Sequence, residues 1–349
     1  MPCCALRSIF SLTVVTLAFA AQSIGQQVVA KIPAPASYLI KDIAVDSGNS
    51  RVYVSLYYTD TTGPNGAALL IIDGKSNTVV KSSGVGASGE LPLGLAVDAA
   101  THKLYVTNCF LVIPMVPCYV NIFDPDGNSL GSTLVTQTSN AGLASIAVNP
   151  VTNVVYVSDQ DETDSEGNNI TVIDGATDDV VAYISFGQDN PGVLAVDPLN
   201  NELFVVATSG TLEVINGRTN AVVRSSASGE FGQSLVLDPF TGKAYVGLSS
   251  GVFGVVDMAT LTTIATKNIP PVVAVDTASD RVFSTAASHA IAVVDGKTGR
   301  RIDTIRNATG PLGVNMATGV IYALAEPVNV SEVICCGAAE TIAAIKEPR

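Results

Sequence analysis

One acidic run in the chain has the composition of an ion-binding loop. Five carboxylates fall within eight residues between positions 159 and 166, and a glycine follows at position 167. Oxygen ligands clustered beside a turn glycine suit a hard cation, so this run predicts calcium binding. The candidate ligands are Asp159, Asp161, Asp164 and Glu166. The spacing does not match an EF-hand loop, and a solvated acidic loop is the alternative interpretation.

Two cysteines enclose a segment without charged residues. Cys109 and Cys118 bracket the eight residues FLVIPMVP, and their spacing suits a disulfide that closes a hairpin loop. On the chain-entropy model such a bond stabilises a fold by about 2–3 kcal/mol. Cys335 and Cys336 are adjacent in the chain. A strained vicinal bond, pairing elsewhere and a bond between two chains are the alternatives for this second pair.

Few residues suit enzyme chemistry. The chain has two histidines, His102 and His289, and no tryptophan. The pattern Gly-x-Ser-x-Gly occurs at residues 127–131 and 247–251, and Gly-x-Gly-x-x-Gly occurs at residues 84–89. No helical pattern follows any of them, as a nucleophile motif or a phosphate-binding glycine loop requires. The residues therefore favour a protein without catalytic activity, and no cofactor other than calcium is indicated.

A repeat that runs along most of the chain must position these groups. Seven times, a short apolar segment ends in Asp or Asn, and Tyr or Phe follows seven residues later. The polar anchors are Asp46, Asp98, Asn149, Asp197, Asp238, Asp276 and Asn315. The aromatic residues are Tyr53, Tyr105, Tyr156, Phe204, Tyr245, Phe283 and Tyr322. A fixed offset that recurs in this way indicates a repeat protein with one continuous structure.

Each repeat holds four short segments rich in β-branched residues and bounded by Gly, Asn and Asp, which predicts four strands and their turns. Successive anchors are 38 to 52 residues apart, a length that suits one propeller blade. The sequence therefore predicts an all-β fold, a seven-bladed β-propeller of four-stranded antiparallel blades. We expect each anchor to bond backbone amides in a tight turn, and each aromatic residue to fill the space between blades.

The last blade lacks a fourth strand at the C-terminal end of the chain. Residues 27–32 precede the first repeat and resemble the fourth strands elsewhere. We expect this N-terminal strand to complete the last blade and close the ring, which removes two open sheet edges.

The repeat resembles the YVTN-type β-propeller family over about residues 27–346. Residues 105–108 read YVTN, residues 53–55 and 156–158 read YVS, and residues 172–177 read VIDGAT, which matches the second half of the family motif. The later repeats depart from it, with FST at 283–285 and YAL at 322–324. The resemblance implies a propeller with an extracellular or surface role in binding or scaffolding, and it implies no shared catalytic residues.

Extra loop length gathers on one side of the predicted ring. The interval from the aromatic residue to the last residue of the third strand is 12 residues in blades 4, 5 and 6. The same interval is 20, 19, 18 and 24 residues in blades 1, 2, 3 and 7. Blades 7, 1, 2 and 3 are neighbours in a closed ring, so their long loops lie together on the face where second strands end. We call this the loop face. Long loops on a rigid scaffold favour a binding surface, and neutral insertion is the alternative.

The candidate contact residues on the loop face come from blades 1 and 2. They are Tyr57, Tyr58, Phe110, Leu111, Val112, Ile113, Met115 and Val116. The segment between the two cysteines contacts a partner if it is exposed. If it folds over the mouth of the central channel, it is a plug.

The termini and composition indicate export. Residues 1–20 have the positive, apolar and A-x-A parts of a secretory signal, with cleavage after Ala20 or at a later position up to 26, and an uncleaved anchor is the alternative. Residues 27–349 then form a single propeller domain. With 31 Asp and Glu against 18 Lys and Arg, the chain is too acidic to favour nucleic acid or an anionic membrane surface as partner. No segment after the signal is long and apolar enough to span a membrane.

The sequence as a whole predicts a secreted, non-catalytic propeller, periplasmic, cell-surface or extracellular, whose loop face binds a protein or glycan. One alternative is a lactonase-like hydrolase or lyase with an active site built from the long loops. Another is a structural subunit of a self-assembling surface layer.

Overall fold

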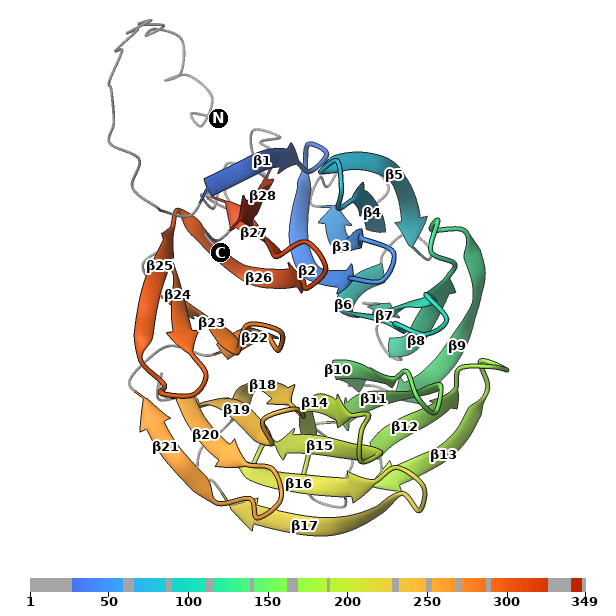
Figure 1. Ribbon diagram of the computed structural model, residues 1–349. Helices are drawn as coiled ribbons and strands as arrows, with labels where there is room; N and C mark the ends of the chain where they lie inside the picture. Colours follow the sequence, from blue (N-terminus) through green and yellow to red (C-terminus); the bar gives the residue numbers. More distant parts are fainter. Residues whose placement is uncertain are drawn as a thin grey trace, which may run out of the picture.

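The computed structural model describes residues 27–58, 66–85, 90–110, 116–138, 141–161, 169–186, 189–227, 232–248, 253–267, 272–286, 290–325 and 340–346. Within these ranges, 28 strands form seven four-stranded antiparallel sheets arranged in a ring (Figure 1). The described residues contain no helix, and therefore none that could cross a membrane. The protein is thus an all-β, seven-bladed propeller, as the repeat predicts.

Six blades are each built from four consecutive strands. Blade 1 comprises β2 (Tyr38–Asp46), β3 (Arg51–Tyr58), β4 (Ala67–Asp73) and β5 (Thr78–Val85). Blade 2 comprises β6 (Glu90–Val97), β7 (Leu104–Phe110), β8 (Val116–Phe123) and β9 (Ser129–Thr138). Blade 3 comprises β10 (Ala141–Asn149), β11 (Val154–Asp161), β12 (Asn169–Asp174) and β13 (Val180–Ser185). Blade 4 comprises β14 (Pro191–Asp197), β15 (Glu202–Ala207), β16 (Thr211–Asn216) and β17 (Ala221–Ala227). Blade 5 comprises β18 (Gly232–Asp238), β19 (Lys243–Leu248), β20 (Phe253–Asp257) and β21 (Thr263–Lys267). Blade 6 comprises β22 (Val272–Asp276), β23 (Arg281–Ala286), β24 (Ala290–Asp295) and β25 (Arg301–Arg306).

The seventh blade joins the two ends of the described chain. Its strand order is β1-β28-β27-β26, with β26 (Ala308–Asn315), β27 (Val320–Ala325), β28 (Thr341–Lys346) and β1 (Gln27–Pro33). β1 and β28, the two strands nearest the rim, are antiparallel, and Gln27 lies opposite Lys346 in their register. The predicted closure of the ring by the N-terminal strand is therefore confirmed.

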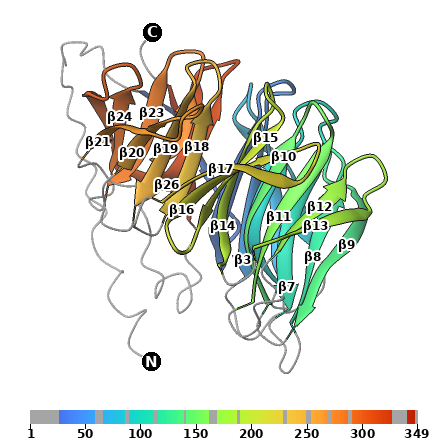
Figure 2. The same ribbon diagram turned by 90° about the horizontal axis from the view of Figure 1, so that it is seen from below.

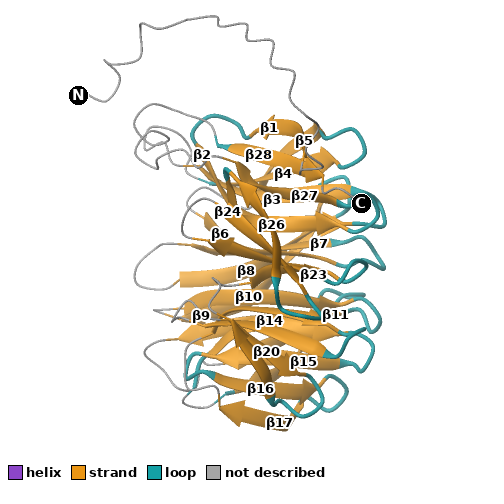
Figure 3. Ribbon diagram, turned by 60° about the vertical axis from the view of Figure 1, so that its left-hand side comes forward, coloured by secondary structure: helices purple, strands orange, loops and turns teal. Residues whose placement is uncertain are grey.

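In every blade the first strand lies nearest the axis of the ring and the fourth strand lies at the rim (Figure 1). Seen from the side, the strands of neighbouring blades run side by side through the thickness of the disc (Figure 2). The described turns from first to second and from third to fourth strands gather on one face, drawn in teal in Figure 3. We call this the turn face; it is opposite the loop face.

The polar anchors hold the turns on the turn face, as predicted. Each of the seven accepts a hydrogen bond at 2.8–3.1 Å from the backbone amide two residues later. The residue four positions after each anchor has a left-handed backbone, with φ between 51° and 67°. These turn residues are Ser50, His102, Asn153, Asn201, Gly242, Asp280 and Gly319. Asn, Asp and Gly tolerate this conformation best, which explains most of the choices.

The repeated aromatic residues lie between the blades, as predicted. All seven are at most 1% exposed. Tyr53 of blade 1, for example, packs in one cluster with Leu95, Leu104 and Val106 of blade 2. Because every blade contributes such a residue to its neighbour, burial of aromatic surface holds the ring together.

The hydroxyls of Tyr53, Tyr245 and Tyr322 add a polar contact to the next blade, whereas Tyr105 Oη is buried without a hydrogen-bond partner among the described residues. Tyr322 Oη lies 3.2 Å from the carbonyl oxygen of Gly74 and 2.6 Å from Asn77 Oδ1 of blade 1. Tyr53 Oη donates to the carbonyl of Pro125 at 3.1 Å. In each case the acceptors belong to the turn that follows the third strand of the neighbour. These bonds satisfy buried hydroxyls and help to fix where neighbouring blades meet.

Candidate functional site

The described part of the loop face carries three tyrosines at the end of blade 1. Tyr38 begins β2 and lies opposite Tyr58 in the register of β2 and β3, with ring centroids 4.9 Å apart. Tyr57 points to the other side of the strand, where the Lys41 ammonium lies 5.6 Å from its ring centroid. The tyrosines are half-buried and Lys41 is exposed. Aromatic surface and a positive charge therefore reach solvent at the same blade end.

A buried carboxylate from the last blade supports this cluster. Glu340 precedes β28, is 5% exposed, and accepts a hydrogen bond from the Ile40 amide at 2.6 Å. Desolvation raises the pKa of Glu340, while the Ile40 bond and the Lys41 charge act in the opposite direction. The carbonyl of Glu340 also accepts from the Ala34 amide at 2.9 Å. The strand that carries Tyr38 and Lys41 is thus fixed at the point where the ring closes.

Asp42, on the strand nearest the axis, joins blades 1 and 2. Its Oδ1 accepts from the Ile43 amide at 2.8 Å and its Oδ2 from the Leu95 amide at 3.1 Å. Burial raises the pKa of Asp42 to about 6, although both hydrogen bonds lower it. Ser145 makes the matching contact between blades 3 and 4, where its Oγ accepts from the Leu194 amide at 3.1 Å. Since a neutral hydroxyl performs the same task there, the contact itself does not require a charge.

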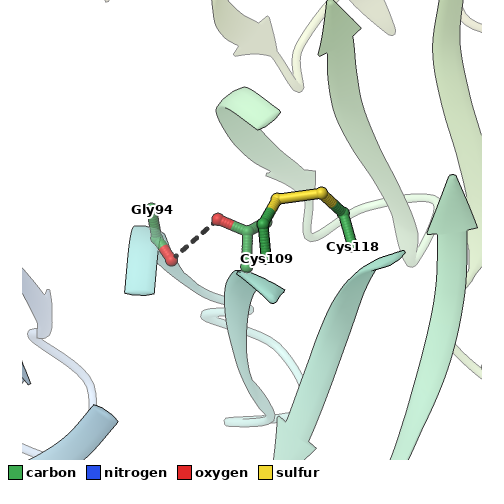
Figure 4. The surroundings of a disulfide bond; sticks show 4 residues. Gly94, Cys109 and Cys118 are labelled. Atoms are coloured by element: carbon green, nitrogen blue, oxygen red, sulfur yellow. Dashed lines mark hydrogen bonds between the residues drawn. A yellow bond between two sulfur atoms is a disulfide. The ribbon is translucent and has the colours of Figure 1, made fainter. Parts of the chain in front are cut away.

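The predicted disulfide is present. Cys109 of β7 and Cys118 of β8 are opposite each other in the strand register, with Cα atoms 4.1 Å apart, and both are buried. Figure 4 shows the bond beside Gly94, whose carbonyl accepts from Thr107 Oγ1 at 3.3 Å. The bond ties the ends of the two strands that lead into the apolar segment.

Most of that apolar segment lies outside the described residues. Phe110 ends β7 and is half-buried. Val116 begins β8, but its side chain is not described, and Leu111, Val112, Ile113 and Met115 fall in the undescribed stretch. Exposure and burial over the channel mouth both stay open as interpretations of this segment.

The acidic run is described only at its start. Asp159 lies in β11, is 5% exposed, and is opposite Asn169 in the register. The backbone of Asp161 ends β11, while its side chain and all of Asp164 and Glu166 lie outside the described residues. In the part that is described, no group of three or more His, Cys, Asp and Glu side chains could hold a metal ion. Calcium binding by this run stays a prediction.

The turn face holds a contact that sequence reasoning missed. His102 lies in a turn, as predicted, but its Nδ1 is 2.6 Å from Oδ2 of Asp46 in the preceding blade. The His102 side chain is 32% exposed and that of Asp46 is fully buried. The sequence feature that could have pointed to this role is the position of His102 four residues after the anchor Asp98, where every repeat has its turn residue. His289 falls outside the described residues.

No protein-family model matches this chain, and no curated protein sequence matches it. The propeller is established by the structure, whereas membership of the YVTN-type family is not confirmed. Function is therefore inferred from the fold and from the residues on its two faces.

Proposed function

We propose that this is a secreted, non-catalytic propeller that recognises a protein or glycan through its loop face. The observation that supports this most is the cluster of Tyr38, Tyr57, Tyr58 and Lys41 at the end of blade 1. Tyrosine offers a flat apolar ring with a polar tip, which suits sugar rings and peptide side chains alike. The disulfide between Cys109 and Cys118 supports an oxidising compartment, and hence secretion.

Binding of the purified chain, without residues 1–26, to a glycan array and to intact cell surfaces tests this proposal. Tyr57→Ala and Lys41→Ala should each weaken binding by roughly tenfold, as expected for an aromatic or cationic contact residue. Tyr183→Ala is the matched control, because Tyr183 is 60% exposed on β13 at the rim. Equal binding by all three variants and the parent would contradict a ligand site at blade 1.

A lactonase-like hydrolase or lyase is the second candidate, and Asp42 favours it. A carboxyl with a pKa of about 6 near the axis of a propeller is well suited to act as a general base. Against this, both of its oxygens accept backbone amides. Turnover of lactone or ester substrates that disappears in Asp42→Ser would favour the enzyme.

Self-assembly into a surface layer is the third candidate, and the rim favours it. Rim strands expose large apolar side chains, among them Leu130 of β9, Val181 of β13 and Ile302 of β25. β9 and β13 are adjacent rim strands and carry no charged residue. Uncharged edge strands pair readily with other chains. Concentration-dependent growth of large assemblies, abolished by Leu134→Lys, would support this role.

A further inference from the structure

On the turn face, the anchor of one blade contacts the turn residue of the next at three junctions. Besides Asp46 and His102, Asn149 Nδ2 donates to Asn201 Oδ1 at 2.8 Å between blades 3 and 4. Between blades 2 and 3, the surrounding donors and acceptors assign the Asn153 amide nitrogen to the side of the anchor, where Nδ2 donates to Asp98 Oδ2 at 3.1 Å. In all three contacts an acceptor meets a group that can donate.

Where the next blade has glycine as its turn residue, the anchor finds a partner in its own turn instead. Asp197 precedes the blade of Gly242, and its Oδ2 accepts from Asn200 Nδ2 at 2.8 Å. Asp276 precedes the blade of Gly319, and its Oδ2 accepts from Ser279 Oγ at 2.7 Å. Four of the five aspartate anchors therefore have a partner for their second carboxylate oxygen.

Asp238, between blades 5 and 6, is the exception. It is fully buried, and its Oδ1 accepts from the amides of Phe240 and Thr241 at 3.1 and 3.3 Å. Its Oδ2 is buried and has no hydrogen-bond partner among the described residues. The turn residue of the next blade is Asp280, and both of its carboxylate oxygens are likewise buried and without a partner. At this junction the anchor and the turn residue of the next blade are both carboxylates, which accept hydrogen bonds, whereas elsewhere an acceptor faces a group that can donate.

The surroundings leave negative charge at this junction. The pKa of Tyr245 is raised first by desolvation and then by the charges of Asp280, Asp238 and Asp295, so all three carboxylates act on one hydroxyl. Lys243 is the neighbouring ammonium, but its Nζ donates to the Gly296 carbonyl at 2.6 Å and forms none of the ion pairs found within 4.0 Å in the described chain. Burying carboxylate oxygens that have neither a hydrogen bond nor a nearby counter-charge is strongly unfavourable.

We propose that Asp238 and Asp280 bind a calcium-type cation that joins blades 5 and 6. Three carboxylate oxygens of the pair, Asp238 Oδ2 and both oxygens of Asp280, are available as ligands, which suits a hard cation. Because no third acidic, histidine or cysteine side chain completes the group, water and backbone carbonyls supply the remaining ligands. The site is separate from the acidic run between positions 159 and 166.

The pairings elsewhere in the ring supply the variants for a test. Asp280→Asn recreates the pairing of Asp98 with Asn153, so it should fold without the ion. Asn153→Asp does the reverse, and places two carboxylates between blades 2 and 3. The parent and both variants are melted after chelation and again with calcium chloride, and calcium binding is measured by calorimetry.

The parent should melt roughly 5 °C higher at a calcium concentration about 100 times the dissociation constant. Asp280→Asn should lose this shift and melt, after chelation, at or above the temperature of the chelated parent. Asn153→Asp should gain a second calcium-dependent shift. The double variant Asp161→Ala with Asp164→Ala should keep the parent's shift, since it changes only the acidic run.

Two results would overturn the proposal. One is a calcium shift that survives in Asp280→Asn or disappears in the double variant of the acidic run. The other is a parent that gives no heat and no shift with calcium.

Discussion

Phe204 of blade 4 and Met258 of blade 5 lie in one buried cluster, at a junction where neither the tyrosine nor the turn glycine of other blades is present. At the junction of blades 7 and 1, Tyr322 instead donates to the turn that contains Gly74. A side chain at Gly74 would place Cβ 3.2 Å from that hydroxyl. The aromatic residue of one blade and the turn residue of the next therefore match each other in size and polarity.

This match predicts that removing the hydroxyl at one junction and adding one at another both destabilise the fold. Tyr322→Phe should lower the free energy of unfolding by about 1 kcal/mol, because hydrogen bonds to Gly74 and Asn77 are lost. Phe204→Tyr should also destabilise, by about 1–3 kcal/mol, because the added hydroxyl is buried against Met258. Urea unfolding of both variants measures this, and a Phe204→Tyr variant more stable than the parent would contradict the match.

The pairing of β1 with β28 predicts that the ring depends on its N-terminal strand. Deletion of residues 27–33 should leave β28 with an open edge and abolish a single cooperative unfolding transition. Deletion of residues 1–26 is the control and should leave the transition unchanged. Calorimetry distinguishes the two, and a parent-like melting curve for the first deletion would show that closure is dispensable.

Asp42 predicts a pH dependence of stability. Its pKa in the folded protein is about 6, above the ordinary value of 3.8, so between these pH values the folded protein holds a proton that the unfolded chain has lost. The contribution of this proton to stability is present below pH 4 and is lost as the pH rises through 6. Urea unfolding from pH 4 to 7 should show this decline. Asp42→Ser, which copies Ser145, should remove the decline and keep the contact between blades.

The disulfide predicts a stability loss on reduction. Replacement of Cys109 and Cys118 by alanine should lower the free energy of unfolding by about 2–3 kcal/mol, since the bond closes a loop between residues nine positions apart. The folded core should remain, because β7 and β8 also pair along six positions. Unfolding with and without a reductant checks this: the parent should become less stable and the variant should not respond.

The seven anchors and their aromatic partners made the fold predictable, because each has a fixed offset along the chain and a local structural task. The ring closure followed from the count of strands. The contacts between blades were harder to predict, because Asp46 and His102 are 56 residues apart in the chain. They meet only because the turns of neighbouring blades lie side by side in the folded ring. The residues four positions after each anchor carry that information, but only the left-handed backbone shows that they share a role.

The cluster on the loop face shows a different limit. Tyr57 and Tyr58 were predicted from their place at a strand end, whereas Tyr38 and Lys41 belong to the opposite strand and have no repeat counterpart that marks them. Their proximity depends on the register of β2 and β3, which shifts between Ile40 and Asp42. A one-residue shift changes which side chains share a face, and the hydrophobic pattern alone does not fix it.

The pairing of residues 27–33 with residues 341–346 also sets the order in which the molecule can be made. Among the described strands, β1 is synthesised first and its partner β28 last. Six blades can form one after another while the seventh stays unfinished, and through that time β1 has no partner strand. Such half-built rings expose strands that can join other chains, so we expect the growing chain to be prone to aggregation until β28 emerges.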